Sequence, residues 1–205
     1  GYAYAVRRFG GNMTISDYIS EYLEMEKKTI ESLNREELLS VVNAFLDVYE
    51  KEGTIYVFGN GGSASTASHM ANDYNKGLNE FLDKKFRFVC LNDNVATLMS
   101  IANDISYEEV FRMQLRGKLE EKDLVVGISG SGNSMNVINA ISYAKEMGVK
   151  TVGLCGYEGG KLKALSDVVL HVKLNNMQIV EDIHLIFNHL LMYVCQRHMN
   201  IPSCH

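Results

Sequence analysis

Two glycine- and serine-rich segments of the chain contain the residue types that bind an anion. Residues 59–63 read Gly-Asn-Gly-Gly-Ser, and residues 129–134 read Ser-Gly-Ser-Gly-Asn-Ser. Glycine lets backbone N–H groups approach an anion closely, and the serine hydroxyls add further donors. Neither segment contains the lysine of a triphosphate-binding P-loop, so a phosphate monoester is the better fit. One such segment alone is as easily an ordinary turn, but two of them favour a phosphate site.

The first segment also matches a dinucleotide-binding fingerprint, G-x-G-x-x-A, through Gly59, Gly61 and Ala64. The acidic residue that would bind the ribose should follow about 20 residues later. Here the next candidate is Asp93, at a distance of about 30 residues. We therefore expect no nucleotide cofactor.

Histidines and carboxylates recur at helical spacing in two other regions. His69 and Asp73 are four residues apart, which puts them on one face of a helix. Glu181 and His189 are eight residues apart, about 80° around a helix. Two imidazoles and two carboxylates could form an acid–base pair or hold a metal ion. Spacing alone does not say whether the two helices meet.

Composition excludes several classes of protein. The 205 residues include 20 basic and 25 acidic side chains, for a net charge of −5. This argues against a nucleic-acid binder, which usually presents a basic face. No apolar run reaches the roughly 18 residues of a membrane span, and no secretory signal is recognisable. Cys90, Cys155 and Cys195 lie in apolar runs without metal-binding spacing, so we expect buried free thiols in a cytoplasmic protein.

Apolar periodicity predicts alternating helices and strands. A capping box at Asn34 and Glu37 should start the second helix, Gly53 should end it, and Ser106 should cap a later one. The expected strands are residues 54–58, 87–91, 124–128, 150–154 and 168–172. The expected helices are residues 14–33, a second helix between Asn34 and Gly53, and residues 64–75, 95–103, 107–119, 134–147, 161–165 and 178–198.

The alternation predicts a three-layer α/β domain, with a five-stranded parallel sheet between helices on both faces. We expect one domain over residues 14–198, an extension over residues 1–13 and a tail over residues 199–205. Ligands of such sheets bind beyond the carboxyl ends of the strands, where both glycine-rich segments should lie. The first two helices are apolar on more than one side, which predicts a helix-mediated dimer or tetramer with its site near a subunit boundary.

Several motifs together resemble the phosphoheptose isomerases of the sugar-isomerase (SIS) superfamily. They are residues 59–73, 98–104, 109–111, 127–138, 154–161 and 181–189, and the resemblance covers roughly residues 14–197. It implies the SIS fold and a homotetramer whose N-terminal helices pack together. It also implies conversion of sedoheptulose 7-phosphate to a glycero-manno-heptose 7-phosphate.

The resemblance further implies roles for particular residues. The positions of Asp73 and His189 hold the base and the acid, and some family members bind zinc there together with the positions of His69 and Glu181. The phosphate would lie on residues 129–134. The substrate-binding residues that we expect are Asn60, Gly61, Ser63, Asn94, Ser129, Ser131, Ser134 and Glu181.

The chain departs from the family pattern at acidic positions. Asp73 stands where the family has Glu, Glu181 where it has Gln, and Asn94 and Thr66 where it has Asp. A base shortened by one C–C bond, about 1.5 Å, must be compensated by a backbone shift or a metal.

Two other functions remain open from the sequence. The altered acidic positions favour a non-catalytic SIS module that binds a phosphosugar or a protein, as in a relative that associates with the bacterial replication initiator. Retention of His69 and His189 favours an enzyme, because an adaptor needs neither. A nucleotide-sugar or dinucleotide binder is the third and weaker alternative.

Overall fold

The computed structural model describes residues 13–201. These fall into two compact units. The first ends at Ser32 and the second begins at Leu33. The first unit consists of the helix α1 (Ile15–Ser32), where Thr14 and Asp17 cap each other's N–H groups at 3.2 and 2.7 Å. The expected extension, apart from Met13, and the end of the expected tail lie outside the described residues.

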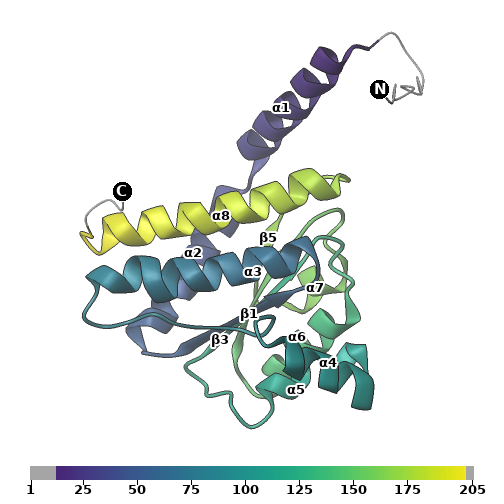
Figure 1. Cartoon of the computed structure of the whole chain (residues 1–205). Coiled ribbons are helices and arrows are strands. Elements are labelled where there is room, and N and C mark those ends of the chain that lie inside the picture. The colour runs from purple at the N-terminus through teal and green to yellow at the C-terminus, as the bar shows by residue number, and fades with distance from the viewer. Residues whose placement is uncertain (1–12, 202–205) are drawn as a thin grey trace, which may run out of the picture. The chain divides into compact units, whose positions relative to one another are not determined.

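The second unit contains the predicted five-stranded parallel sheet, in the order β2-β1-β3-β4-β5 (Figure 1). The strands are β1 (Thr54–Gly59), β2 (Arg87–Cys90), β3 (Leu124–Ser129), β4 (Lys150–Cys155) and β5 (Val168–His171). From β1 the chain first adds β2 on one side and then adds β3, β4 and β5 on the other, so the strand order reverses between β1 and β3. Ligands of open α/β sheets bind at this kind of switch point, and both glycine-rich segments follow these two strands.

Helices cover both faces of the sheet, as predicted. They are α2 (Arg35–Glu50), α3 (Gly62–Asn72), α4 (Val95–Asp104), α5 (Arg112–Leu115), α6 (Met135–Glu146), α7 (Gly160–Leu165) and α8 (Met177–His198). Alternate residues of β1 point to opposite faces. Ile55 packs in the core beneath α2, α3 and α8, whereas Phe58 packs in the core beneath α5, α6 and α7.

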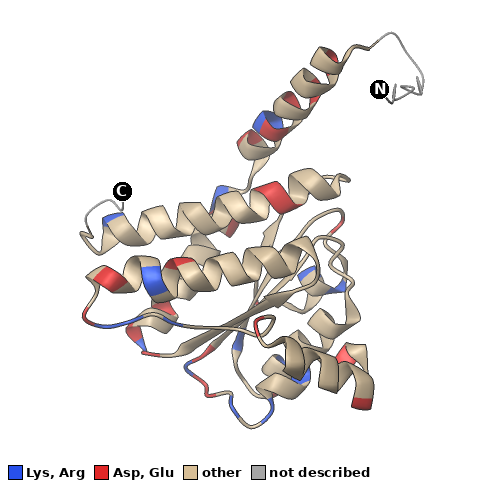
Figure 2. Ribbon diagram, viewed as in Figure 1, with Lys and Arg blue, Asp and Glu red and all other residues tan. Residues whose placement is uncertain are grey.

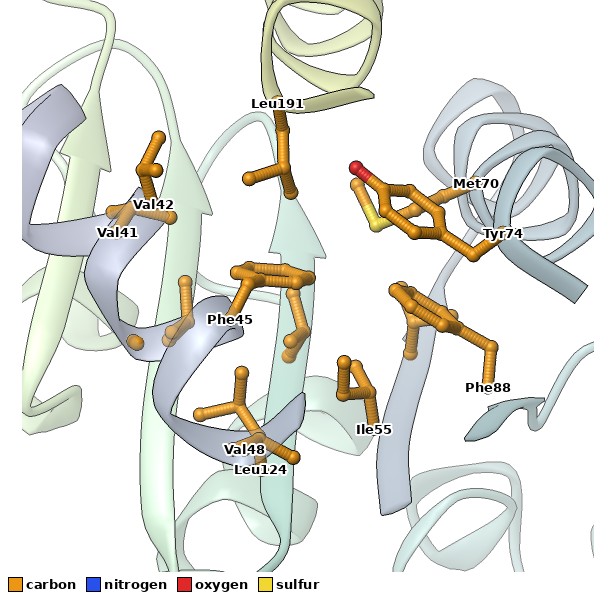
Figure 3. Close-up of a cluster of buried hydrophobic side chains, with 14 of the residues drawn as sticks. Val41, Val42, Phe45, Val48, Ile55, Met70, Tyr74, Phe88, Leu124 and Leu191 are labelled. Carbon is orange, nitrogen blue, oxygen red and sulfur yellow. The ribbon is translucent and has the colours of Figure 1, made fainter. Parts of the chain in front are cut away.

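The first of these two cores joins the helices that carry the predicted histidines. Phe45 of α2 stacks on Phe88 of β2, with ring centroids 6.1 Å apart. Figure 3 shows Met70 and Leu191 converging on this aromatic pair from α3 and α8. Each such buried side chain contributes about 1.5–3 kcal/mol. The core therefore holds α3 and α8 in place against the sheet.

The structure corrects the prediction of one helix over residues 107–119. The segment forms a 3₁₀ turn, η3 (Tyr107–Glu109), and the short α5. The Gln114 amide donates to the carbonyls of Val110 and Leu91, at 2.8 and 3.0 Å, and so ties this segment to the end of β2. Gly117 then turns the chain with φ +72°. Ser106 makes no capping hydrogen bond through its side chain.

A second correction concerns the predicted helix over residues 64–75. The α-helix ends at Asn72 and passes into a π-helix, η1 (Asp73–Leu78), which is followed by a 3₁₀ turn, η2 (Asn79–Phe81). Such widened turns are rare and frequently occur at functional sites. Asp73 is the first residue of this widened segment.

The predicted capping box at the start of α2 forms only in part. The Asn34 side chain accepts the N–H groups of Glu36 and Glu37, at 2.9 and 3.2 Å. The Glu37 carboxylate, however, accepts the N–H of His171 at 3.0 Å. The residue thus ties α2 to the end of β5.

The positions of lysine and arginine are dispersed over several elements and are mixed with acidic positions (Figure 2). None of the helices in residues 13–201 is long and apolar enough to cross a membrane.

Candidate active site

A small hollow of about 110 Å³ lies at the carboxyl ends of β1 and β3. It is lined by Asn60, Ser63, Ile128, Ser129, Gly130, Ser131, Ser134, Met177 and Glu181. The switch point between the two strands thus brings both glycine-rich segments to one place. Six of the eight predicted substrate-binding residues line it, and Gly61 and Asn94 do not.

Serine hydroxyls gather at one side of this hollow. The hydroxyls of Ser129 and Ser134 lie 3.0 Å apart. Ser134 occupies the N-cap position of α6, but its side chain makes no capping hydrogen bond. Hydroxyl groups at a helix N-terminus are suited to an anion, because the helix dipole and the first N–H groups favour negative charge.

The second glycine-rich segment is held in shape by the loop that follows β4. The N–H of Gly156 donates to the carbonyl of Gly130 at 2.8 Å, and the N–H of Leu162 donates to that of Gly132 at 2.9 Å. Gly132 has φ +67°, and a Cβ there would collide with the carbonyl of Gly159. This close approach explains why both loops need glycine.

Asn60 is mostly committed to neighbouring side chains. Its Nδ2 donates to Asn136 Oδ1 at 2.8 Å, and its Oδ1 accepts from Asn136 Nδ2 at 2.9 Å and from the Tyr107 hydroxyl at 2.8 Å. An amide group has two N–H donors, so one remains for a ligand. Asn136 and Tyr107 were not singled out from the sequence, because their roles depend on contacts between distant segments.

Gly61 and Asn94 have backbone roles in the structure. Gly61 has φ +54° and precedes the first residue of α3. The Asn94 side chain caps α4 by accepting the N–H of Thr97 at 3.0 Å. Asparagine is among the preferred N-cap residues, and this signal was present in the sequence.

The predicted histidines and Asp73 meet between α3 and α8. These helices lie side by side and run in the same direction (Figure 1). Nε2 of His69 lies 3.2 Å from Asp73 Oδ2 and 3.2 Å from His189 Nε2, and His189 Nε2 lies 3.6 Å from Asp73 Oδ2. The His69 and His189 side chains are 42% and 54% exposed, whereas that of Asp73 is 14% exposed. A reactant can therefore reach the imidazoles, and the carboxylate lies beneath them.

The three atoms have the spacing of ligands around one tetrahedral metal ion. Zinc–nitrogen and zinc–oxygen bonds of about 2.0–2.1 Å place tetrahedral ligand atoms about 3.3 Å from each other. The observed separations of 3.2, 3.2 and 3.6 Å fit this value. Two imidazoles and a carboxylate are also a donor set that zinc prefers. These residues can hold a metal ion or, without one, form a hydrogen-bonded acid–base cluster.

The structure does not bring Glu181 into this cluster, contrary to the four-ligand set implied by the resemblance. Among the described residues, the possible metal ligands that lie together are His69, Asp73 and His189. Eight residues of helix separate Glu181 from His189, about 12 Å along α8. Glu181 instead lines the hollow at the ends of β1 and β3, and lies so close to Gly62 that a Cβ at Gly62 would collide with its carboxylate.

The hollow and the histidine cluster lie along one pair of helices. Ser63 and Glu181 line the hollow near the N-termini of α3 and α8, and His69 and His189 follow further along the same helices. The rise from Ser63 to His69 is about 9 Å. An extended seven-carbon sugar spans roughly 10 Å from its first carbon to a terminal phosphorus, given bond lengths near 1.5 Å. The two parts of the site are thus spaced for the two ends of such a molecule.

Comparison with known proteins identifies the family of this chain. A family model described as SIS domain matches residues 17–156. The phosphoheptose isomerase of Helicobacter pylori (strain P12) is 39% identical over 175 residues, 85% of this chain and 90% of the relative. That of Aliarcobacter butzleri (strain RM4018) is 32% identical over 188 residues, 90% of this chain and 98% of the relative.

Solved structures are similar over the same extent. The phosphoheptose isomerase GmhA of Neisseria gonorrhoeae superposes with a TM-score of 0.82 at 28% identity, covering 90% of this chain and all of that one. The phosphoheptose isomerase of Francisella tularensis has a TM-score of 0.83 at 25% identity, with the same coverage.

Proposed function

Because this chain belongs to the phosphoheptose isomerase family of SIS-domain proteins, we propose that it interconverts sedoheptulose 7-phosphate and D-glycero-D-manno-heptose 7-phosphate. The observation that carries the proposal is the placement of an anion-binding hollow and a histidine–carboxylate cluster along α3 and α8. Their spacing suits a seven-carbon sugar with a phosphate at one end.

The phosphate is anchored by neutral donors. Ser63, Ser129, Ser131 and Ser134 provide hydroxyls around the hollow, and the start of α6 adds backbone N–H groups. Glu181 accepts hydrogen bonds from sugar hydroxyls next to the phosphate, because an ionised carboxylate can only accept. The anchor directs the other end of the sugar toward the histidines.

Aldose–ketose isomerisation moves one proton between the first two carbons through an enediol. Asp73 Oδ2 takes a proton from C1 of the ketose and, after this proton exchanges with solvent, delivers a proton to C2. His189 donates a proton to the carbonyl oxygen at C2 and receives the proton of the hydroxyl at C1. Electrons and protons balance, and both groups return to their starting states. The 3.6 Å between His189 Nε2 and Asp73 Oδ2 lets the two groups address adjacent carbons.

His69, Asp73 and His189 would hold the zinc ion that the resemblance implies. In that state His189 Nε2 and Asp73 Oδ2 bind the ion, so the proton transfers above belong to the metal-free cluster. Three protein ligands leave a fourth tetrahedral position open, as in catalytic zinc sites. When bound there, the ion would polarise the oxygen of the substrate carbonyl. The protein's part is to hold the three ligand atoms at the observed separations.

We also propose that the SIS domain, residues 14–198, forms a cytoplasmic homotetramer through its N-terminal helices. The helix α1 carries exposed apolar side chains, including Ile15, Ile19 and Leu23. A helix with such a face is usually covered by a partner. Light scattering should give about four times the 23.0 kDa of one chain, and the mass of a single chain at micromolar concentration would contradict this.

The activity is tested by incubating the protein with sedoheptulose 7-phosphate, with and without added zinc, and recording the anomeric signals by NMR. We expect a new aldose signal, which is absent with His189→Ala. A thermal shift with sedoheptulose 7-phosphate but no turnover would indicate a non-catalytic binding module instead. A large thermal shift with NAD, and none with phosphosugars, would indicate a dinucleotide binder.

A further inference from the structure

A buried asparagine contacts the carboxylate at the centre of the cluster. Asn188 of α8 is 0% exposed and lies between Phe187 and His189 in the sequence. Its Nδ2 donates to Asp73 Oδ2 at 2.7 Å, the shortest contact that this oxygen makes in the cluster. Asn188 thus connects α8 to Asp73, the predicted base, from the protein interior.

The interior position of this amide is unfavourable in itself. Asn188 lies next to buried apolar side chains of α8, such as Phe187 and Leu191, which belong to the core. Asn188 Oδ1 is buried and has no hydrogen-bond partner among the described residues. A leucine, whose side chain has the same number and branching of heavy atoms, would avoid this unsatisfied carbonyl. The buried amide therefore lowers the stability of the fold, and the hydrogen bond that it makes is the one to Asp73.

We propose that Asn188 is a positioning residue that fixes Asp73 Oδ2 between the two histidines. This inference rests on the proposed function, since it assigns a role within that active site. A carboxylate oxygen has two lone-pair directions. The amide occupies one of them from the buried side, which leaves the other directed toward His69 and His189 for a proton or a metal ion.

The position of Asp73 explains why an anchor for its side chain is needed. Asp73 is the C-terminal cap of α3 and has helical backbone angles, φ −59° and ψ −33°, and the π-helix η1 begins there. An aspartate is also short, so small rotations displace its oxygens from the imidazoles. A displacement of about 1 Å can cost about 100-fold in rate. The Asn188 hydrogen bond restricts this rotation.

The substitution Asn188→Leu tests the proposal, because a positioning role and a structural role predict opposite changes. We expect kcat to fall by about 10- to 100-fold, as when other residues that orient metal ligands are replaced. KM should stay within about twofold, since the phosphate hollow is not touched. The melting temperature should be unchanged or higher. The matched control is Leu191→Met, at a fully buried position of the same helix, which should change neither kcat nor KM.

A zinc titration of metal-free protein without a histidine tag supplies a readout independent of activity. Asn188→Leu should weaken zinc binding by about 10- to 100-fold, but by less than about twofold in an Asp73→Asn background, where the carboxylate is already absent. Retention of both kcat and zinc affinity would overturn the proposal, as would a joint loss of kcat and melting temperature.

The same experiment separates this inference from the proposed function. If the unaltered protein shows no turnover, but Asn188→Leu still weakens zinc binding, the assigned reaction is wrong and the positioning role stands. If the unaltered protein neither turns over substrate nor binds zinc, both the reaction and the positioning role are wrong.

Discussion

The buried imidazole of His184 should make the protein sensitive to mild acid. His184 is 1% exposed on α8, and its Nε2 donates to the carbonyl of Cys155 at 3.2 Å. Burial lowers the pKa of this histidine from 6.5 to about 4, and the hydrogen bond to Cys155 opposes the shift only in part. The folded protein therefore keeps His184 neutral at pH values where the unfolded chain binds a proton.

The sign and size of the effect follow from this difference. Between pH 6.5 and about 4 the unfolded chain holds one more proton at this position, so the free energy of unfolding falls as the pH falls. Above pH 6.5 the neutral His184 does not lower the free energy of unfolding. Below that pH the free energy falls, and the loss is complete by about pH 4. One pKa unit corresponds to about 1.4 kcal/mol, so the complete loss is about 3 kcal/mol.

Urea unfolding at pH 7 and pH 4.5 measures this loss, with His184→Gln as the comparison. Glutamine can still donate to the Cys155 carbonyl but does not titrate. Carboxylates affect both proteins alike, so they cancel in the difference. We expect the unaltered protein to lose about 2 kcal/mol more than the variant between these pH values. Equal losses, within about 0.5 kcal/mol, would refute the reasoning.

Three further predictions concern the anion-binding hollow and the buried thiols. Ser134→Ala should raise KM for the sugar phosphate about 10-fold with little change in kcat, because it removes a hydrogen bond to a charged group; an unchanged KM in steady-state kinetics would contradict the anchor. Glu181→Gln should lower the inhibition constant of inorganic phosphate by about threefold, since it removes a nearby negative charge. Elemental analysis should find the same zinc content in this variant as in the unaltered protein. A loss of zinc would show that Glu181 is a metal ligand. Burial raises the pKa of the Cys155 and Cys195 thiols to about 12, so mass spectrometry after alkylation at pH 8 should find both unmodified until the protein unfolds, and rapid native alkylation of either would show the burial to be wrong.

Most of the fold could be predicted because its signals are local. β-branched apolar runs mark the strands, and Asn34 marks the start of α2 at the observed position. The segment after Ser106 was predicted wrongly because its apolar spacing is helical, and that spacing does not show the contact of the Gln114 side chain with Leu91 on another element. The π-helix at Asp73 leaves no known signature in the apolar spacing.

The site could be predicted only where neighbours along the chain define it. The spacing of His69 and Asp73 predicted their shared face, and the structure adds that His189 meets them. Glu181 was assigned to the metal because the resemblance implies a ligand at its position, where this chain has a carboxylate instead of the family's amide. Asn188 was missed because an asparagine in an apolar helix face reveals its role only through its contact with Asp73.

The central claim is that this chain isomerises a seven-carbon sugar phosphate by moving a proton with Asp73 and His189. Sedoheptulose 7-phosphate incubated with the protein in D₂O tests it in one NMR measurement. The account predicts an aldose product that carries deuterium at C2, because the proton held by the base exchanges with solvent at the enediol stage. Failure to form any aldose, with or without zinc, or a product with no deuterium at C2, would contradict it.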